Sequence, residues 1–267
     1  MPAAILYNNL TSTLLPLATP AAIDTAPASN LVDPQPRLRA AWSGTTVSLV
    51  YDLGVLTSIE AVALISTTIA AAATVRARLS VADATGETGD AWDSGVVTAD
   101  TSDLAGGNVI LLRPYAAALA AGRYLRVDIV DATAGRIDMG RVVAGPLWRI
   151  AAGASLGGRE GRLILDQRDR NPLTGAEFAL PAIANPRMAN ITLPLLTRTE
   201  AAGAARTMLD NIGAAGDVLW VPETTLGQPE LNRRCIWGAA ARGGEDVVIE
   251  QRTQTRHLRT LRLVERL

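Results

Sequence analysis

One segment of the sequence has the spacing of a serine-hydrolase nucleophile turn. Residues 153–157 read Gly-Ala-Ser-Leu-Gly, which puts Ser155 at the nucleophile position, and His257 is the only histidine that could act as its base. Such a turn works only between a buried strand and a helix. Here a short apolar run precedes it and the strand-like segment Arg162–Leu165 follows it. The context therefore predicts no catalytic residue, and we expect a protein that is not an enzyme.

Acidic residues gather in the turns of the first half of the chain. Hydrolysis of a glycosidic bond needs two carboxylates, and Ca²⁺ prefers oxygen ligands on turns. No EF-hand spacing is present, and a single cysteine and a single histidine exclude a metal cluster of the Cys/His type. We expect solvated surface acids, no metal site and no cofactor, with a structural calcium ion as the alternative. The acids are Asp83, Glu87, Asp90, Asp93, Asp100 and Asp103.

Trp92 is the tryptophan best placed to contact a ligand. It lies between Asp90 and Asp93 in a polar, turn-like segment, where an exposed indole could stack on a sugar or on a partner. Trp92, Asp93 and Asp90 are therefore the candidate ligand-binding residues. The β-prone segments around Trp220 and Trp237 instead predict core positions for these two indoles.

The charge balance argues against nucleic acid as a partner. All 25 basic residues are arginine, and 26 acidic residues bring the net charge to −1, so no general field attracts nucleic acid or an anionic membrane. A C-terminal arginine series lacks the interleaved aromatic residues on which bases stack. We interpret it as a solvated or subunit-facing strand: Arg252, Arg256, Arg259, Arg262 and Arg266.

The amino terminus and the longest apolar stretch predict no membrane targeting. Residues 1–22 lack the basic region of a secretory signal, because the first arginine is Arg37. Residues 61–75 are interrupted by Ser66, Thr67 and Thr68 and fall short of the roughly 20 residues of a membrane helix. We expect no spanning segment, and synthesis in the cytoplasm without a signal peptide.

A proline-rich lead-in over residues 1–44 must lie against the rest of the protein, and short β-prone runs separated by turn signals follow it. Polar and apolar residues alternate in Tyr124–Val130 and in Thr74–Val81, which predicts half-buried strands of antiparallel sheets. The spacing of the runs is typical of a β-sandwich. The runs are Thr45–Leu53, Ile59–Ser66, Thr74–Val81, Val109–Arg113, Tyr124–Val130 and Arg136–Val143.

The glycine-dense segment 144–161 predicts a junction between two domains, 1–150 and 151–267. In the second domain we expect strands over 162–167, 191–196, 218–221, 234–239 and 247–263, and one helix over 199–212 capped by Thr199. The predicted fold is therefore mainly β. An N-terminal β-sandwich is followed by a second, mostly β assembly domain with one packed α-helix.

The first half of the chain contains, in order, Asn30–Pro34, Tyr51–Gly54, Ala63–Ile65, Trp92–Gly95, Arg123–Ile129 and Asp138–Gly145. This series resembles the galactose-binding-like (discoidin-type) jelly-roll module in tail-tip proteins of long-tailed bacteriophages. Val218–Pro222 and Arg234–Gly238 resemble strands in the second domain of those proteins.

The resemblance implies a structural protein of the virion, at the tail tip, of the distal tail type. Such a protein forms a homo-oligomeric ring that joins the tail tube and tape measure to the hub or fibres. The alternative is a carbohydrate-binding module that recognises a host surface glycan. Sugar-binding members of the family offer aromatic or histidine side chains on their loops, whereas the loop after Ile65 reads Ser-Thr-Thr.

Overall fold

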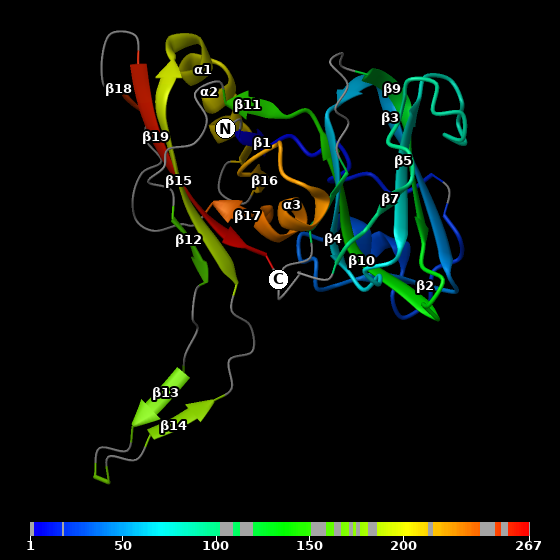
Figure 1. Cartoon of the computed structure of the whole chain (residues 1–267), viewed down its shortest axis with the longest axis horizontal. Coiled ribbons are helices and arrows are strands. Elements are labelled where there is room, and N and C mark those ends of the chain that lie inside the picture. Colours follow the sequence, from blue (N-terminus) through cyan, green and yellow to red (C-terminus); the bar gives the residue numbers. More distant parts are fainter. Residues whose placement is uncertain are drawn as a thin grey trace.

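The chain folds into three large β-sheets with a separate two-stranded ribbon (Figure 1). The computed structural model describes residues 3–17, 19–101, 109–112, 120–150, 159–162, 167–170, 173–174, 177–180, 186–212, 216–240, 249–251 and 256–266. Within these ranges every pairing between strands is antiparallel. The mainly β fold class predicted from the sequence is confirmed.

Two of the sheets form a β-sandwich. One has the strand order β3-β9-β5-β6, with β7 also paired to β5, and the other has the order β2-β10-β4-β8. All six β-prone runs predicted for this region are strands. The bounds are β2 (Ala40–Ser43), β3 (Thr46–Ile59), β4 (Ala61–Thr67), β5 (Thr74–Ser80), β6 (Trp92–Asp93), β7 (Val97–Thr98), β8 (Val109–Leu112), β9 (Ala120–Val130) and β10 (Arg136–Gly145).

The side chains of alternate strand residues fill the space between these two sheets. Leu125, Val127 and Ile129 of β9 are fully buried, whereas the residues between them face outward, as the period-two pattern predicts. They pack in one core with Trp42 and Tyr51, the largest buried side chains of the sandwich. The same alternation therefore determines which face of the five-stranded sheet is exposed to solvent.

The third sheet has eight strands, in the order β11-β1-β16-β17-β19-β15-β12, with β18 also paired to β19. Because β1 and β11 are neighbours, the whole sandwich lies in sequence between two adjacent strands of this sheet. The division at residue 150 stays a prediction, although β1 and β11 share a sheet with strands from after that residue. The bounds are β1 (Ala3–Leu6), β11 (Trp148–Ile150), β12 (Arg159–Arg162), β15 (Arg187–Thr197), β16 (Asp217–Val221), β17 (Ile236–Ala240), β18 (Ile249–Gln251) and β19 (Arg256–Glu265).

The four-stranded sheet is covered on both sides. Val62 and Leu64 of β4 face the sandwich core, whereas Ala63 and Ile65 belong to a second cluster that includes Trp237 of β17. The continuous apolar run of β4 follows from this double burial, because neither face of the strand meets water. The sandwich and the eight-stranded sheet are therefore held together by a shared apolar layer.

A buried group of charges lies at this junction. Arg141 of β10 donates to the carbonyl oxygens of Asp33 at 3.1 Å and Ser12 at 3.0 Å, and its guanidinium lies 5.7 Å from the ring centre of Trp237. Asp217 of β16 lies 3.9 Å from Arg141. Burial lowers the pKa of Arg141 and raises the pKa of Asp217. These contacts join β10, the lead-in and the eight-stranded sheet.

Two helices, α1 (Arg198–Ala202) and α2 (Ala204–Ile212), cover the outer face of the eight-stranded sheet. They correspond to the single helix predicted over 199–212, but the helix is interrupted at Gly203. Its cap is Thr197 rather than Thr199. The Thr197 hydroxyl accepts from the Glu200 amide at 3.2 Å, and the Glu200 carboxylate accepts from the Thr197 amide at 2.9 Å, so the pair forms a capping box.

Two further helical segments were not predicted. The helix α3 (Gln228–Arg234) precedes β17, so the strand expected over 234–239 begins two residues later. A 3₁₀ helix, η1 (Ala28–Val32), lies in the lead-in. Among the residues that the structure describes, none of the helices has the length and apolar character needed to cross a membrane.

The lead-in packs along the sandwich, as its proline content predicts. The amide of Leu10 donates to the Ala144 carbonyl of β10 at 2.8 Å, and the amide of Leu17 donates to the Val50 carbonyl of β3 at 2.6 Å. β3 is an edge strand of its sheet. β2 pairs with β10 only over Arg136–Met139, so β2 does not cover β10 near Ala144. The lead-in therefore covers open edges of both sandwich sheets.

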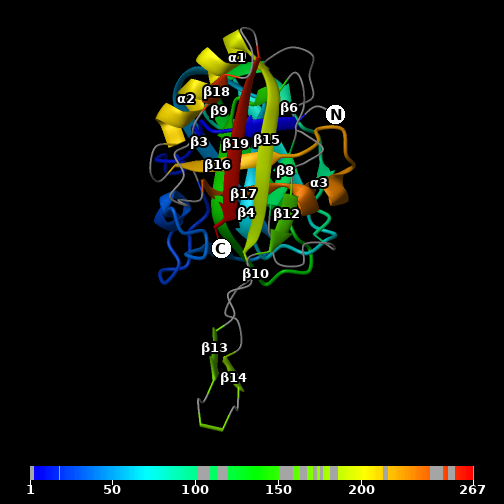
Figure 2. The same ribbon diagram turned by 90° about the vertical axis from the view of Figure 1, so that its left-hand side faces the viewer.

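The ribbon consists of β13 (Gln167–Arg170) and β14 (Glu177–Leu180), which pair with each other through four residue pairs. It projects away from the body in both views (Figures 1 and 2). Among the described residues, these strands pair with no other strand. The ribbon therefore stands apart from the three sheets.

Gly140 allows the lead-in to reach β10. A methyl group at this position would lie 2.2 Å from the Pro36 carbonyl oxygen, far inside contact distance. We expect Gly140→Ala to lower the free energy of unfolding by about 2 kcal/mol, because the lead-in must shift. Denaturant unfolding measures the change. Gly135→Ala is the matched control, since nothing lies within 4 Å of its added methyl group, and an equal loss in both variants would contradict this role of Gly140.

Candidate functional site

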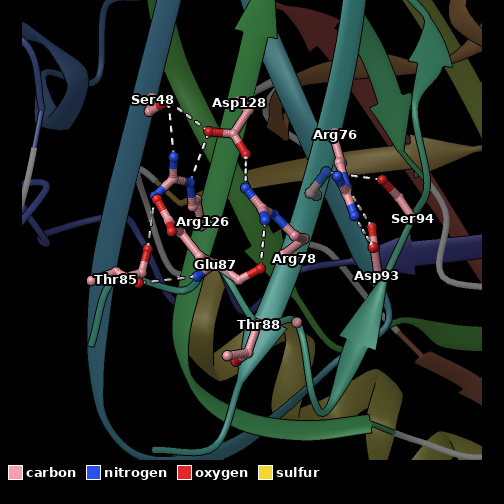
Figure 3. Close-up of polar contacts among 12 residues, drawn as sticks. Ser48, Arg76, Arg78, Thr85, Glu87, Thr88, Asp93, Ser94, Arg126 and Asp128 are labelled. Atoms are coloured by element: carbon pink, nitrogen blue, oxygen red, sulfur yellow. Dashed lines mark hydrogen bonds and ion pairs between the residues drawn. The ribbon is translucent and has the colours of Figure 1, made fainter. Parts of the chain in front are cut away.

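The outer face of the five-stranded sheet carries a cluster of arginines and carboxylates (Figure 3). The register pairs Arg76 with Asp128 and Arg78 with Arg126 across β5 and β9. Because paired residues share a face and alternate residues do too, these four side chains project from one surface. Their strand neighbours form the sandwich core on the other side.

Asp128 lies at the centre of the cluster. It accepts hydrogen bonds from Arg78 at 2.5 Å, Arg126 at 2.8 Å and the Ser48 hydroxyl at 2.6 Å. Burial alone raises the pKa of Asp128, but these three donors outweigh it and hold the pKa below its usual range. The side chains of Asp128, Arg78 and Arg126 are only 17%, 12% and 16% exposed. This part of the cluster is therefore structural.

The loop over residues 81–91 covers these two arginines. Arg126 donates to the Thr85 carbonyl and the Glu87 carboxylate, both at 3.1 Å, and Arg78 donates to the Glu87 carbonyl at 2.5 Å. Gly86 has a φ of +65° and lies so close to Arg126 that a methyl group would be 2.7 Å from its Cβ. The loop is thus pinned to the sheet by guanidinium groups.

Arg76 and Asp93 form the exposed part of the cluster. The guanidinium donates two hydrogen bonds to the carboxylate, one of them at 2.9 Å from Nε, and the two side chains are 38% and 32% exposed. Asp93 also accepts from the Gly95 amide at 2.9 Å. The hydrogen bond from Arg76 is the main cause that lowers the pKa of Asp93. A guanidinium and a carboxylate are therefore presented to solvent in a fixed arrangement.

The three candidate ligand residues do not form one surface. β6 pairs Asp93 with Arg78 and Trp92 with Leu79, so Asp93 lies on the polar face and Trp92 faces the core, against which it packs half-buried. Asp90 accepts from the Val81 amide at 3.0 Å within the loop. Only Asp93 joins the arginine cluster.

The other residues considered from the sequence are distributed as follows. Ser155 and Asp103 lie outside the described residues. His257 is in β19, where its backbone pairs with Leu196 and Gln251. Within the described residues no three acidic, histidine or cysteine side chains are grouped so as to hold a metal ion.

The arginines of the cluster are residues that sequence reasoning placed on a wet strand face but did not identify as a site. The available signal was the arginine-rich outer positions of two alternating strands, Arg76, Arg78 and Arg126. Their grouping with Asp93 depends on the pairing of β6 with β5. That pairing joins segments separated by a loop and has no local sequence signature.

Comparison with known proteins identifies a similar fold only at a distance. No protein-family model matches the chain, and no curated protein matches it. The lectin domain of lectinolysin, complexed with Lewis B antigen, is 14% identical with a TM-score of 0.37 and aligns over 51% of this chain and 95% of its own.

Two other solved structures are similar to the same extent. A chitosan-binding module from a Paenibacillus chitosanase/glucanase is 15% identical, with a TM-score of 0.38, and covers 52% of this chain and 99% of that one. A fucose-binding module of Streptococcus pneumoniae is 11% identical, with a TM-score of 0.36 and coverages of 52% and 98%. TM-scores below 0.5 assign no ligand to this chain, and none of these three structures is a phage tail protein.

Asp128 gives the cluster a pH dependence. Its pKa is lower in the folded than in the unfolded chain, so its stabilising contribution is complete above about pH 4 and is lost as the pH falls through the folded pKa. We expect Asp128→Asn to lower the free energy of unfolding by about 2 kcal/mol at pH 7, discounted for partial exposure. Its stability should then vary less than that of the wild type below pH 4. Urea unfolding at several pH values tests this.

The exposed residue Asp24 provides the matched control for that measurement. Asp24→Asn should leave the stability at pH 7 close to that of the unchanged chain. Parallel pH profiles for Asp128→Asn and the wild type would contradict the role of Asp128.

Proposed function

We propose that the sandwich is a non-catalytic carbohydrate-binding module and that Arg76 and Asp93 contact the sugar. The observation that carries this proposal is the exposed, doubly hydrogen-bonded pair on the outer face of the sheet. Sugar hydroxyls both donate and accept hydrogen bonds, and a guanidinium beside a carboxylate offers both partners at once. The similar structures named above include sugar-binding modules, but the proposal rests on this face.

Preorganisation and charge support this assignment. Arg76 is held in β5 and Asp93 is fixed by the Gly95 amide, so little side-chain freedom is lost when a ligand binds. On this surface the three arginines Arg76, Arg78 and Arg126 face Asp93, Asp128 and Glu87. The balanced charge suits a neutral sugar rather than an acidic one.

The electrostatics of the face also support the absence of catalysis. Hydrolysis of a glycoside needs one carboxyl group that carries a proton near neutral pH. Hydrogen bonds instead lower the pKa of Asp83 through Thr85, of Asp90 through the Val81 amide and of Asp93 through Arg76. These carboxyl groups are ionised at neutral pH and are suited to accepting hydrogen bonds, not to donating a proton.

The test is binding of the full chain to a glycan array, followed by titration of the sugars that bind. We expect Arg76→Ala and Asp93→Asn each to weaken binding at least tenfold, because each removes one half of the pair. Arg136→Ala is the matched control, since Arg136 forms a similar exposed pair with Asp138 on the other sheet, at 2.5 Å. Absence of any sugar ligand, or equal binding by all three variants, would contradict the proposal.

The second candidate function is that of a structural protein at the tip of a phage tail. The observation that favours it is the projecting ribbon on a body whose layers are continuous with one another. A rigid body with an extended arm suits a protein that works by contact with neighbouring subunits. In this role the chain would form a homo-oligomeric ring in the virion and contact the tape measure, tube and hub proteins.

Antibody labelling of particles from a phage or prophage that encodes the chain tests the second candidate. We expect gold label at one end of the tail and the chain among the proteins of purified particles. Intact particles that lack the chain would exclude the structural role while leaving the glycan-binding proposal untouched. The two candidate functions are therefore tested separately.

A further inference from the structure

The turn that holds Asp93 occurs a second time on the same sheet. In both places an aspartate is followed two residues later by a glycine with a positive φ, +67° at Gly95 and +78° at Gly54. The Gly54 amide donates to the carboxylate of Asp52 at 2.8 Å, as the Gly95 amide does to Asp93. A methyl group added to either glycine would meet nothing within 4 Å, so backbone conformation rather than crowding requires glycine.

An arginine binds each of the two carboxylates in the same way. Arg123 of β9 donates from Nε and Nη2 to the two oxygens of Asp52, both at 2.7 Å. Arg76 donates to Asp93 from the same two nitrogens. The side chains of Arg123 and Asp52 are 42% and 28% exposed. The hydrogen bonds from Arg123 and then from the Gly54 amide lower the pKa of Asp52 to about 2, so this carboxylate is ionised at neutral pH.

Asp52 lies on the outer face of the five-stranded sheet. Ser48 of β3 contacts Asp128 on that face. Asp52 is four residues further along β3, before the irregularity in its pairing with β9, so Ser48 and Asp52 share a face. The register places Asp52 opposite Tyr124, and the guanidinium of Arg123 lies 5.0 Å from the ring centre of Tyr124. The second pair therefore lies beside an aromatic ring, on the surface that carries the first pair.

The two pairs are separate on this surface. Three strand spacings, from β6 through β5 and β9 to β3, and two residues along β3 lie between Asp93 and Asp52, which corresponds to about 16 Å between their Cα atoms. Arg126 lies between them in the sheet, and the loop over residues 81–91 covers it. One sugar ring therefore cannot contact both pairs.

Apolar side chains adjoin the second pair. Val55 and Leu56 directly follow Gly54, in the segment of β3 that leaves the pairing with β9 between Asp52 and Thr57. They are 67% and 60% exposed. A sugar ring carries hydroxyl groups at its edge and C–H groups on its faces, so it suits a surface that combines a polar pair with apolar and aromatic side chains.

We propose that Arg123 and Asp52 form a second binding site for a neutral sugar, so that one chain binds two sugars at once. This assignment rests on the proposed function and extends it from Arg76 and Asp93 to a second pair. When the first site has bound, the second meets its ligand at a high effective concentration. The outer face therefore suits a surface dense in sugar more than a free monosaccharide.

The two glycine amides allow each site to be observed separately by NMR, because each donates to the carboxylate of its own site. We expect a monosaccharide that the full chain binds on the glycan array to shift the resonances of both Gly54 and Gly95. In Arg123→Ala and in Asp52→Asn only the Gly95 resonance should shift on titration. In Arg76→Ala only the Gly54 resonance should shift.

Binding to the immobilised sugar gives the second readout. We expect Arg123→Ala and Asp52→Asn each to weaken the apparent affinity for the array by about tenfold or more, because one of two attachments is lost. Arg136→Ala is again the matched control, since its pair with Asp138 lies on the other sheet. Thermal unfolding of each variant verifies that it is folded.

The outcomes separate the second site from the proposed function. A Gly95 shift without a Gly54 shift in the unchanged chain, with array binding unaffected by Arg123→Ala, would overturn the second site and leave the proposed function intact. A Gly54 shift that persists in both Arg123→Ala and Asp52→Asn would also overturn it, because the sugar would then not depend on this pair. A chain that binds no sugar would overturn both.

Discussion

Burial of the four-stranded sheet on both faces is the constraint on which the arrangement of this protein depends. A sandwich normally needs only one buried face per sheet, but β4 and β10 contribute to two apolar clusters at once. Separating the sandwich from the eight-stranded sheet would expose Ala63, Ile65 and Trp237 together, a contiguous apolar surface that water disfavours. The two parts therefore behave as one body, although the chain enters and leaves the sandwich through adjacent strands.

This constraint decides which faces of the sandwich remain exposed to solvent. The four-stranded sheet is covered on both faces, whereas the outer face of the five-stranded sheet remains available for polar contacts. There the deep members of the cluster, Arg78, Arg126 and Asp128, satisfy one another and anchor a loop. Arg76 and Asp93 combine a fixed geometry with substantial exposure, as do Arg123 and Asp52, whose side chains are 42% and 28% exposed. The network that stiffens this face thus leaves the pair of Arg76 and Asp93 exposed to solvent.

Much of the sandwich could be predicted because its strands carry their own signal. Alternation in β5 and β9 identified the strands and their wet faces. β1 has no such signal: Ala3–Leu6 is apolar at every position because both of its faces are buried, and its partners lie more than 140 residues away. By contrast, α3 had a readable start in Gly227 and Pro229 and two arginines at its end.

The candidate site shows the limit of the same reasoning. Asp93 and Trp92 are adjacent in sequence, and their types suggested one sugar-binding surface. In a strand, however, neighbouring residues face opposite sides, so the register with Arg78 and Leu79 determines which of them is exposed. Residue types therefore singled out the segment, and the sheet pairing places Asp93, rather than Trp92, on the polar face.

The treatment of strand edges distinguishes the ribbon from the body. In the sandwich the lead-in covers edges of β3 and β10, and it requires Gly140 to do so without a clash. Such coverage is how proteins prevent unwanted pairing between sheets. β14 has an apolar edge sequence and, among the described residues, receives no such cover. The body of the protein thus covers its strand edges, whereas the described part of the chain provides no such cover for the edges of the ribbon.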